Sequence, residues 1–97
     1  MSETTNHEHL SAQITGRVQG VGFRHFTCMT ARRLDVSGWV KNESDGSVQV
    51  EAEGPRDDLE ELLDAVRDGP GAAQVQDVSA DWQEATGEHD GTFSVRH

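Results

Sequence analysis

The sequence predicts a single α+β domain whose strands and helices follow the order β-α-β-β-α-β. Three observations support this prediction. Apolar and polar residues alternate in several separate segments, which is typical of strands with one buried face. Another segment repeats apolar residues at i, i+3, i+4 and i+7, the spacing of an amphipathic helix. The chain has 97 residues, a length that suits one domain with one modest core.

The first strand is predicted over residues 10–18, where every second residue is apolar except Gly16 (Leu10, Ala12, Ile14, Val18). The residues before it are polar and unpatterned, so we expect a disordered tail at 1–9 and the domain at 10–97. His7 and His9 in that tail could bind a metal weakly. No other cluster of ligand residues accompanies them in the sequence, and no metal site is predicted.

The first helix is predicted over about Phe23–Leu34, after a turn that contains two glycines. Its apolar stripe is weak, so the sheet must supply most of its packing. Asp35 is expected to end the helix, because aspartate tolerates the left-handed conformation better than most residues. Cys28 is the only cysteine, which excludes an internal disulfide. It is interpreted as a small packing residue, with a reactive thiol as the alternative.

The next two strands are predicted to form a hairpin. One face of the second strand carries only small or apolar residues (Val36, Gly38, Val40). Trp39 lies on the other face, where we expect it to cover a helix or loop edge. The third strand alternates apolar and polar residues over 48–53 and therefore has one solvated face. Asp45-Gly46, between the two strands, is a hairpin turn signal.

The second helix carries the clearest apolar stripe of the chain (Leu59, Leu62, Leu63, Val66). Pro55 is expected to start this helix, at a position where its missing amide does no harm. Asp57 and Asp58 in its first turn suit the positive end of the helix dipole. Gly69-Pro70 is expected to end the helix.

The fourth strand is predicted over residues 73–83. Its apolar residues change parity near Gln76-Asp77, which indicates a β-bulge there. A polar loop over 84–91 then leads to a short fifth strand that contains Phe93 and Val95. The place of this fifth strand in the sheet stays open.

The element order is that of the split β-α-β, or ferredoxin-like, sandwich, with two helices on one face of a mixed sheet. A helical crossover makes the first two strands parallel, so both end at the same edge of the sheet. The third strand is expected between them, which separates them by about 10 Å, two spacings of ~4.8 Å. Asn42 ends the second strand and is therefore expected opposite the glycine turn that follows the first strand.

That glycine turn has the composition of an anion site. It reads Arg17-Val18-Gln19-Gly20-Val21-Gly22-Phe23-Arg24. Its glycines leave backbone amides uncovered, and consecutive amides that open into a helix N-terminus attract an anion. Arg24 adds a planar donor fork that matches phosphate oxygens. The loop lacks the Gly-Lys-Ser/Thr end of a Walker A loop and the third glycine of a dinucleotide fingerprint, and a tight turn with a surface arginine is the alternative.

Together with Gly38-Trp39-Val40-Lys41-Asn42, this loop resembles the acylphosphatase family. That family carries a loop close to Gly-Arg-Val-Gln-Gly-Val-x-Phe-Arg and, further along, Gly-Trp-Val-x-Asn. The resemblance runs from Leu10 to the C-terminus and implies an enzyme that hydrolyses the carboxyl–phosphate bond of acyl phosphates. It implies that Asn42 orients the attacking water. It further implies a phosphate-binding loop that holds the phosphoryl oxygens (Gln19, Gly20, Val21, Gly22, Phe23, Arg24).

The resemblance implies no cofactor and no metal, since Arg24 and the loop amides supply the positive field. The expected partners are small acyl phosphates, with inorganic phosphate or sulfate as inhibitors. His25 is interpreted as a surface histidine, with a general-base role as the alternative. Three other classes compete: a regulatory anion-binding module, an RNA-binding ferredoxin-like domain, and a carbamoyl-phosphate-handling domain of a larger maturation enzyme.

The charge balance restricts the partners further. Eighteen acidic residues face eight basic ones, for a net charge of −10, and Lys41 is the only lysine. Such a surface repels nucleic acid and anionic membranes. Residues 1–42 carry +2 and residues 43–97 carry −12, so the candidate site lies in the half that is not acidic. The acid-rich, lysine-poor composition resembles that of proteins from halophiles. No apolar run could span a membrane, and a monomeric, cytoplasmic protein is expected.

Overall fold

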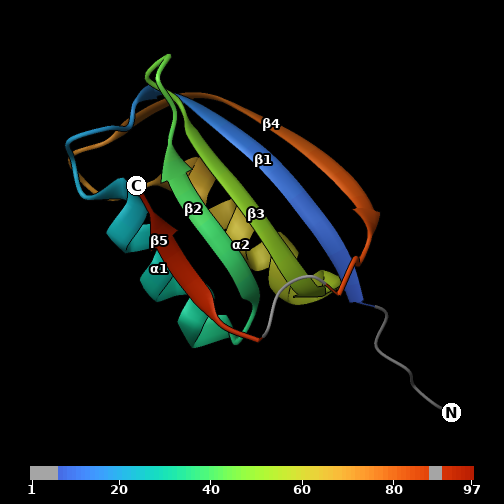
Figure 1. Ribbon diagram of the computed structural model, residues 1–97. Helices are drawn as coiled ribbons and strands as arrows, with labels where there is room; N and C mark the ends of the chain where they lie inside the picture. The colour runs from blue at the N-terminus through green and yellow to red at the C-terminus, as the bar shows by residue number, and fades with distance from the viewer. Residues whose placement is uncertain (1–6, 88–90) are drawn as a thin grey trace, which may run out of the picture.

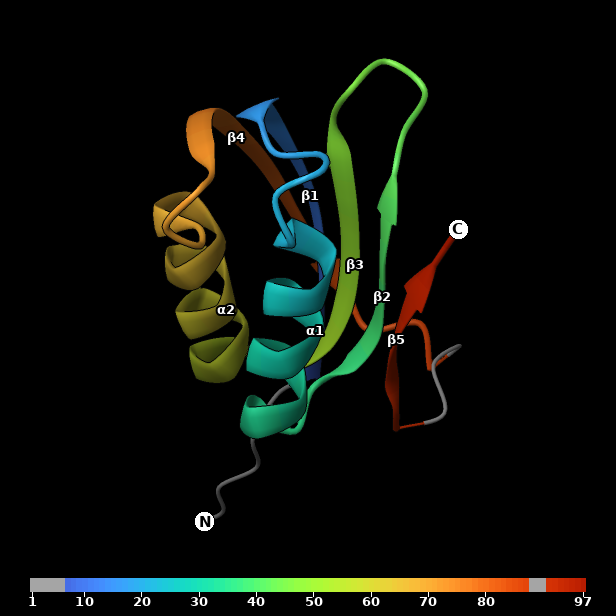
Figure 2. The ribbon, with the colours of Figure 1, turned by 90° about the vertical axis from the view of Figure 1, so that its left-hand side faces the viewer.

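The computed structural model describes residues 7–87 and 91–97. The elements are β1 (His7–Arg17), α1 (Phe23–Leu34), β2 (Ser37–Asn42), β3 (Val48–Pro55), α2 (Arg56–Asp68), β4 (Gln74–Glu84) and β5 (Phe93–Arg96). Figure 1 shows one curved sheet, and Figure 2 shows both helices on the same face of it. The predicted ferredoxin-like α+β fold is confirmed. Neither helix in the described ranges is both long and apolar enough to cross a membrane.

The strand order across the sheet is β4-β1-β3-β2-β5. β1 pairs antiparallel with β3 and with β4, and β2 pairs antiparallel with β3. β3 therefore lies between the two strands that α1 connects, as the sequence predicted. β5 pairs in parallel with β2 and forms one edge of the sheet, while β4 forms the other.

The core lies between the sheet and the helices, and it is built from one parity of each strand and the stripe of α2. The strands contribute apolar side chains to this core (Leu10, Ala12, Ile14, Val40, Val48, Val50, Ala52), and so does α2 (Leu59, Leu62, Leu63, Val66). α1 contributes Phe23 and smaller side chains. The buried hydroxyl of Thr27 donates to the Phe23 carbonyl at 2.9 Å, so it leaves no donor unpaired in the core.

Two details of the predicted secondary structure are confirmed. Thr15 pairs with Asp77 and Gly16 with Val75, so Gln76 is the extra residue of a β-bulge. Gly16 itself is required there, because a Cβ would lie 2.2 Å from the Gln74 carbonyl oxygen. Asp35 ends α1 in the left-handed conformation, with φ of 62°.

One prediction is wrong. β1 begins at His7, so residues 7–9 are strand rather than tail, while residues 1–6 of the predicted tail lie outside the described residues. His9 is buried because two carboxylates, Glu51 and Glu53, hydrogen-bond its ring. Trp39 is absent from the core cluster, and the Arg96 guanidinium lies 4.6 Å from its ring centre. Whether it also covers a loop edge stays a prediction.

Candidate active site at one end of the sheet

The segment between β1 and α1, with the first residues of that helix, forms a loop that we call the cradle (residues 19–24). Gly20 and Gly22 have φ of +76° and +79°, in the left-handed region. A Cβ at either position would meet no atom within 4 Å. Glycine is therefore required by the backbone conformation and not by a lack of space. Val18, which is 1% exposed, anchors the start of the loop in the core.

The backbone amides of the cradle are free. Gly22 precedes α1 and makes no side-chain capping bond, and the first helical bond runs from the Phe26 amide to the Gly22 carbonyl at 3.0 Å. Within the ranges 7–87 and 91–97, none of the amides of residues 19–24 donates a hydrogen bond. Several donors at the positive end of a helix thus remain available for an anion.

Arg24 is the second residue of α1, and its side chain is held by the end of β5. Its Nη1 donates to the Arg96 carbonyl at 3.1 Å and lies 3.2 Å from Nδ1 of His97. Arginine is a donor only, so Nδ1 of His97 is the acceptor in that contact. Nε and Nη2 of Arg24 make no hydrogen bond to another residue of the described ranges, so they can make a bidentate contact with a phosphate.

Asn42, the last residue of β2, carries an unsatisfied acceptor. Its Oδ1 is buried and has no hydrogen-bond partner in the described part of the chain. Buried polar atoms in folded proteins are almost always paired with protein or water. A buried amide oxygen without a partner is therefore the kind of atom that a bound water or ligand would satisfy.

The structure brings the cradle, Arg24 and Asn42 to the same end of the sheet. Arg96, whose carbonyl holds Arg24, pairs with Lys41, the residue before Asn42. The Gln19 amide nitrogen donates to the carbonyls of Glu43 and Ser47, in the turn that follows Asn42. Figures 1 and 2 both show the loop after β1, the β2–β3 turn and the C-terminus gathered at the upper end of the sheet.

His25 and Cys28, the two residues that could modulate activity, differ in their exposure to solvent. The His25 side chain is exposed and makes no hydrogen bond to another described residue, which supports its interpretation as a surface histidine. Cys28 is buried, and its Sγ lies 3.7 Å from the Phe93 carbonyl, as expected of a packing residue. In the described ranges, no group of three or more His, Cys, Asp or Glu residues could hold a metal ion.

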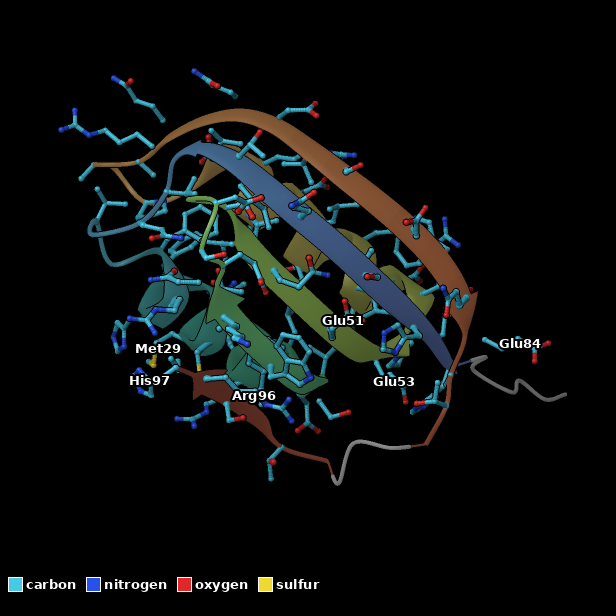
Figure 3. All side chains as sticks on the ribbon, turned by 45° about the horizontal axis from the view of Figure 1, so that its top comes forward. Met29, Glu51, Glu53, Glu84, Arg96 and His97 are labelled. Atoms are coloured by element: carbon cyan, nitrogen blue, oxygen red, sulfur yellow. The ribbon has the colours of Figure 1, made fainter. Side chains whose placement is uncertain are left out.

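The sequence missed the role of Arg96 and His97. Figure 3 labels both at the end of β5. They lie 72 and 73 residues after Arg24 and reach it only because β5 pairs with β2. A four-residue strand does not reveal its partner by pattern alone, so no signal in the sequence points to this contact.

Comparison with known proteins decides the family. The acylphosphatase family model matches residues 10–95. The chain belongs to the acylphosphatase family. It is 60% identical to an acylphosphatase from Salinibacter ruber over 97% of this chain and 98% of that one. The crystal structure of the acylphosphatase from Bacillus subtilis is 38% identical, with a TM-score of 0.88 over 93% of this chain and 99% of that one.

A larger protein shares the fold. Full-length HypF aligns with all of this chain over 13% of its own length, at a TM-score of 0.88 and 24% identity, which shows the fold alone. The acylphosphatase matches, by contrast, span nearly the whole of both chains. The activity is that of an acylphosphatase, hydrolysis of small acyl phosphates to a carboxylate and inorganic phosphate.

Proposed function

We propose that the cradle and Arg24 bind the phosphoryl group of the substrate and that Asn42 holds the water that attacks it. The observation that carries this proposal is that unpaired hydrogen-bond donors and an unpaired buried acceptor lie at the same end of the sheet. Among the described residues, the cradle amides have no acceptor and the buried Oδ1 of Asn42 has no donor. A phosphoryl group needs the donors, and a water molecule supplies the donor that Oδ1 lacks.

The chemistry follows from these groups. The cradle amides, with Nε and Nη2 of Arg24, bind the non-bridging oxygens and balance their negative charge. The water donates one hydrogen bond to Oδ1 of Asn42 and directs a lone pair at phosphorus. The phosphorus–oxygen bond to the acyl group then breaks, and a carboxylate leaves. Asparagine is not a base, so the water proton passes to the phosphate, and the carboxylate needs no acid to leave.

We further propose that the reaction needs no metal, because the cradle and Arg24 supply the positive field that a cation would otherwise provide. Inorganic phosphate and sulfate carry the same tetrahedral oxygens as the substrate, and we expect them to inhibit competitively. The monomeric state and the cytoplasmic location stay predictions from the sequence.

One assay tests the proposed function. Phosphate release is measured from benzoyl phosphate and, in parallel, from a stable phosphate monoester, each with and without EDTA. We expect rapid release from the acyl phosphate alone, unchanged by EDTA and slowed competitively by sulfate. A strict requirement for magnesium, or equal hydrolysis of the monoester, would contradict this mechanism.

A further inference from the structure

The side chain of Gln19 joins the two halves of the site. Gln19 is the first residue of the cradle, and it is partly buried. Its Nε2 donates to the Glu43 carbonyl at 2.8 Å and to the Ser47 carbonyl at 2.9 Å. Both N–H groups of one amide nitrogen are therefore used on the turn between β2 and β3. In the described part of the chain, these are the only hydrogen bonds between residues 18–22 and residues 42–47.

The turn that receives these bonds is rigid. The Glu43 amide donates to the Ser47 carbonyl at 2.8 Å, and the Gly46 amide donates to the Glu43 carbonyl at 3.1 Å. Asp45 closes the turn, since its Oδ1 accepts from the Ser47 amide at 3.0 Å and from the Ser47 hydroxyl at 2.6 Å. These bonds from Ser47 lower the pKa of Asp45. The hydrogen bonds from Gln19 therefore attach the cradle to a turn that is held in place by its own hydrogen bonds.

Asn42 directly precedes that turn, and its backbone is fixed by its pairing with Val48. Gln19 directly precedes the free amides of the cradle. The hydrogen bond from Gln19 to Glu43 thus joins the start of the cradle to the residue that follows Asn42. We propose that Gln19 is a positioning residue that sets the separation between the cradle and Asn42, an inference that rests on the proposed function.

The chemistry makes this separation important. The water must lie in line with the phosphorus–oxygen bond that breaks, while the phosphoryl oxygens stay in the cradle. A displacement of about 1 Å in such an arrangement can cost about a hundredfold in rate. Glutamine suits the task because two carbonyl acceptors require two donors, which one neutral amide nitrogen supplies without placing a charge beside the phosphate.

The test compares two glutamine variants that each lose hydrogen bonds to the same turn. Gln19→Met keeps the length and neutrality of the side chain and removes both donors. Gln13→Met is the matched control. Gln13 lies in β1, outside the cradle, and its Nε2 donates to the Ser47 hydroxyl at 3.2 Å. We expect kcat for benzoyl phosphate to fall about tenfold to a hundredfold in Gln19→Met and to stay within about twofold in Gln13→Met. Inhibition by phosphate should change little in either variant.

A double-mutant cycle separates positioning from general destabilisation. If Gln19 acts through Asn42, then Gln19→Met should change kcat by less than about twofold once Asn42 is alanine. A multiplicative loss in the double variant, or a normal kcat in Gln19→Met, would overturn the proposal. If Gln19→Met does not fold, Gln19→Asn keeps both donors but is one methylene too short to reach both carbonyls, and the same cycle is measured with it. Failure of the proposed function would instead appear as a wild-type protein that does not hydrolyse benzoyl phosphate.

Discussion

The two ends of the sheet are both polar, but they differ in how completely their polar groups are paired. At the end where β1 leads into α1, the cradle amides and Oδ1 of Asn42 have no partners among the described residues. At the opposite end, His9, Glu51 and Glu53 form a cluster in which the ring nitrogens and the carboxylates are hydrogen-bonded. Figure 3 shows Glu51 and Glu53 on one side of the molecule and His97 on the other.

The paired end, which we call the His9 cluster (His9, Glu51, Glu53, Thr86, Gly87), is saturated. The His9 ring reaches Glu53 at 2.7 Å through Nδ1 and Glu51 at 2.5 Å through Nε2. Glu53 also accepts from the Thr86 amide, the Thr86 hydroxyl and the Gly87 amide. Two ionised carboxylates on one ring are both satisfied only when both ring nitrogens donate, which favours the imidazolium form of His9.

The contrast shows that polarity by itself does not mark the active site. The His9 cluster holds three titratable side chains in direct contact, yet their hydrogen bonds are made to groups of the protein itself. The cradle end holds donors and an acceptor in reserve for a ligand. Substitutions at the cradle end should therefore change catalysis with little effect on stability, and substitutions in the His9 cluster should do the reverse.

Arg24→Lys should give the largest effect. Lysine cannot donate two parallel bonds to one phosphate, and it cannot at the same time reach the Arg96 carbonyl. We expect kcat/KM for benzoyl phosphate to fall by about 10³-fold, with the melting temperature nearly unchanged. Arg33→Lys, on the exposed face of the same helix, is the control and should keep wild-type rates. Near-normal efficiency in Arg24→Lys would remove Arg24 from the mechanism.

Asn42→Ala should come next. It removes the acceptor for the attacking water, so we expect kcat to fall by about 10²-fold while the inhibition constant of phosphate stays the same. The free energy of unfolding should change by less than about 0.5 kcal/mol, because Oδ1 has no hydrogen-bond partner among the described residues. Steady-state kinetics and urea unfolding measure the two effects separately. A stability loss without a rate loss would reverse the assignment.

Glu53→Gln tests the opposite end. In the wild type, the Glu53 carboxylate accepts hydrogen bonds from Thr86 and Gly87, and a glutamine amide has one acceptor oxygen fewer. The substitution also leaves the His9 ring with one carboxylate partner instead of two. We expect the free energy of unfolding to fall by about 2 kcal/mol, while kcat is unchanged. Glu61→Gln, at an exposed position on α2, is the control and should be neutral in both measurements. A drop in kcat for Glu53→Gln would mean that the two ends are coupled.

The pKa shifts in the His9 cluster predict how its contribution varies with pH. Burial by itself would lower the pKa of His9, but its hydrogen bonds to Glu51 and Glu53 outweigh burial and raise it. Burial likewise opposes ionisation of Glu53, but the bonds from Thr86, His9 and Gly87 lower its pKa from 4.5 to about 2. The contribution of Glu53 is therefore present above pH 4.5 and is lost as the pH falls toward 2.

The contribution of His9 has the opposite sign. It is fully present below pH 6.5, the ordinary pKa of histidine, and is lost as the pH rises through the raised value. Urea unfolding of the wild type should therefore give a lower free energy at pH 9 than at pH 6, by less than the loss in Glu53→Gln. His9→Gln should be flatter over the same range. An identical slope in the two proteins would contradict the assignment of the ring as an imidazolium.

Local patterns predicted most of the fold, including the position of β3 between β1 and β2, which separates Asn42 from the loop after β1. The bulge at Gln76 was visible because a parity change in a strand must be absorbed by an extra residue. The position of Asn42 could be predicted because a helical crossover makes the two strands it joins parallel, so that both end at the same edge of the sheet. The sequence does not predict that His9 belongs to a strand, because its partners lie 42 and 44 residues away and a local pattern cannot indicate a long-range ion pair. The contact of Arg24 with β5 was hidden for the same reason.

Salt should have the smallest effect, and it should act on the surface rather than on either end of the sheet. The protein has a net charge of −10, so its acidic residues repel one another and also repel an anionic substrate at long range. At 1 M salt the screening length is about 3 Å, so this repulsion is largely removed, while short buried contacts are screened much less. We expect the melting temperature to rise by a few degrees between 0.1 and 2 M potassium chloride, equally in the wild type and in Glu53→Gln, with hydrolysis of benzoyl phosphate retained. Chloride is used because sulfate would compete for the cradle. A flat or falling melting temperature would contradict the prediction, drawn from the acidic composition, of a protein adapted to high salt, and would leave the mechanism untouched.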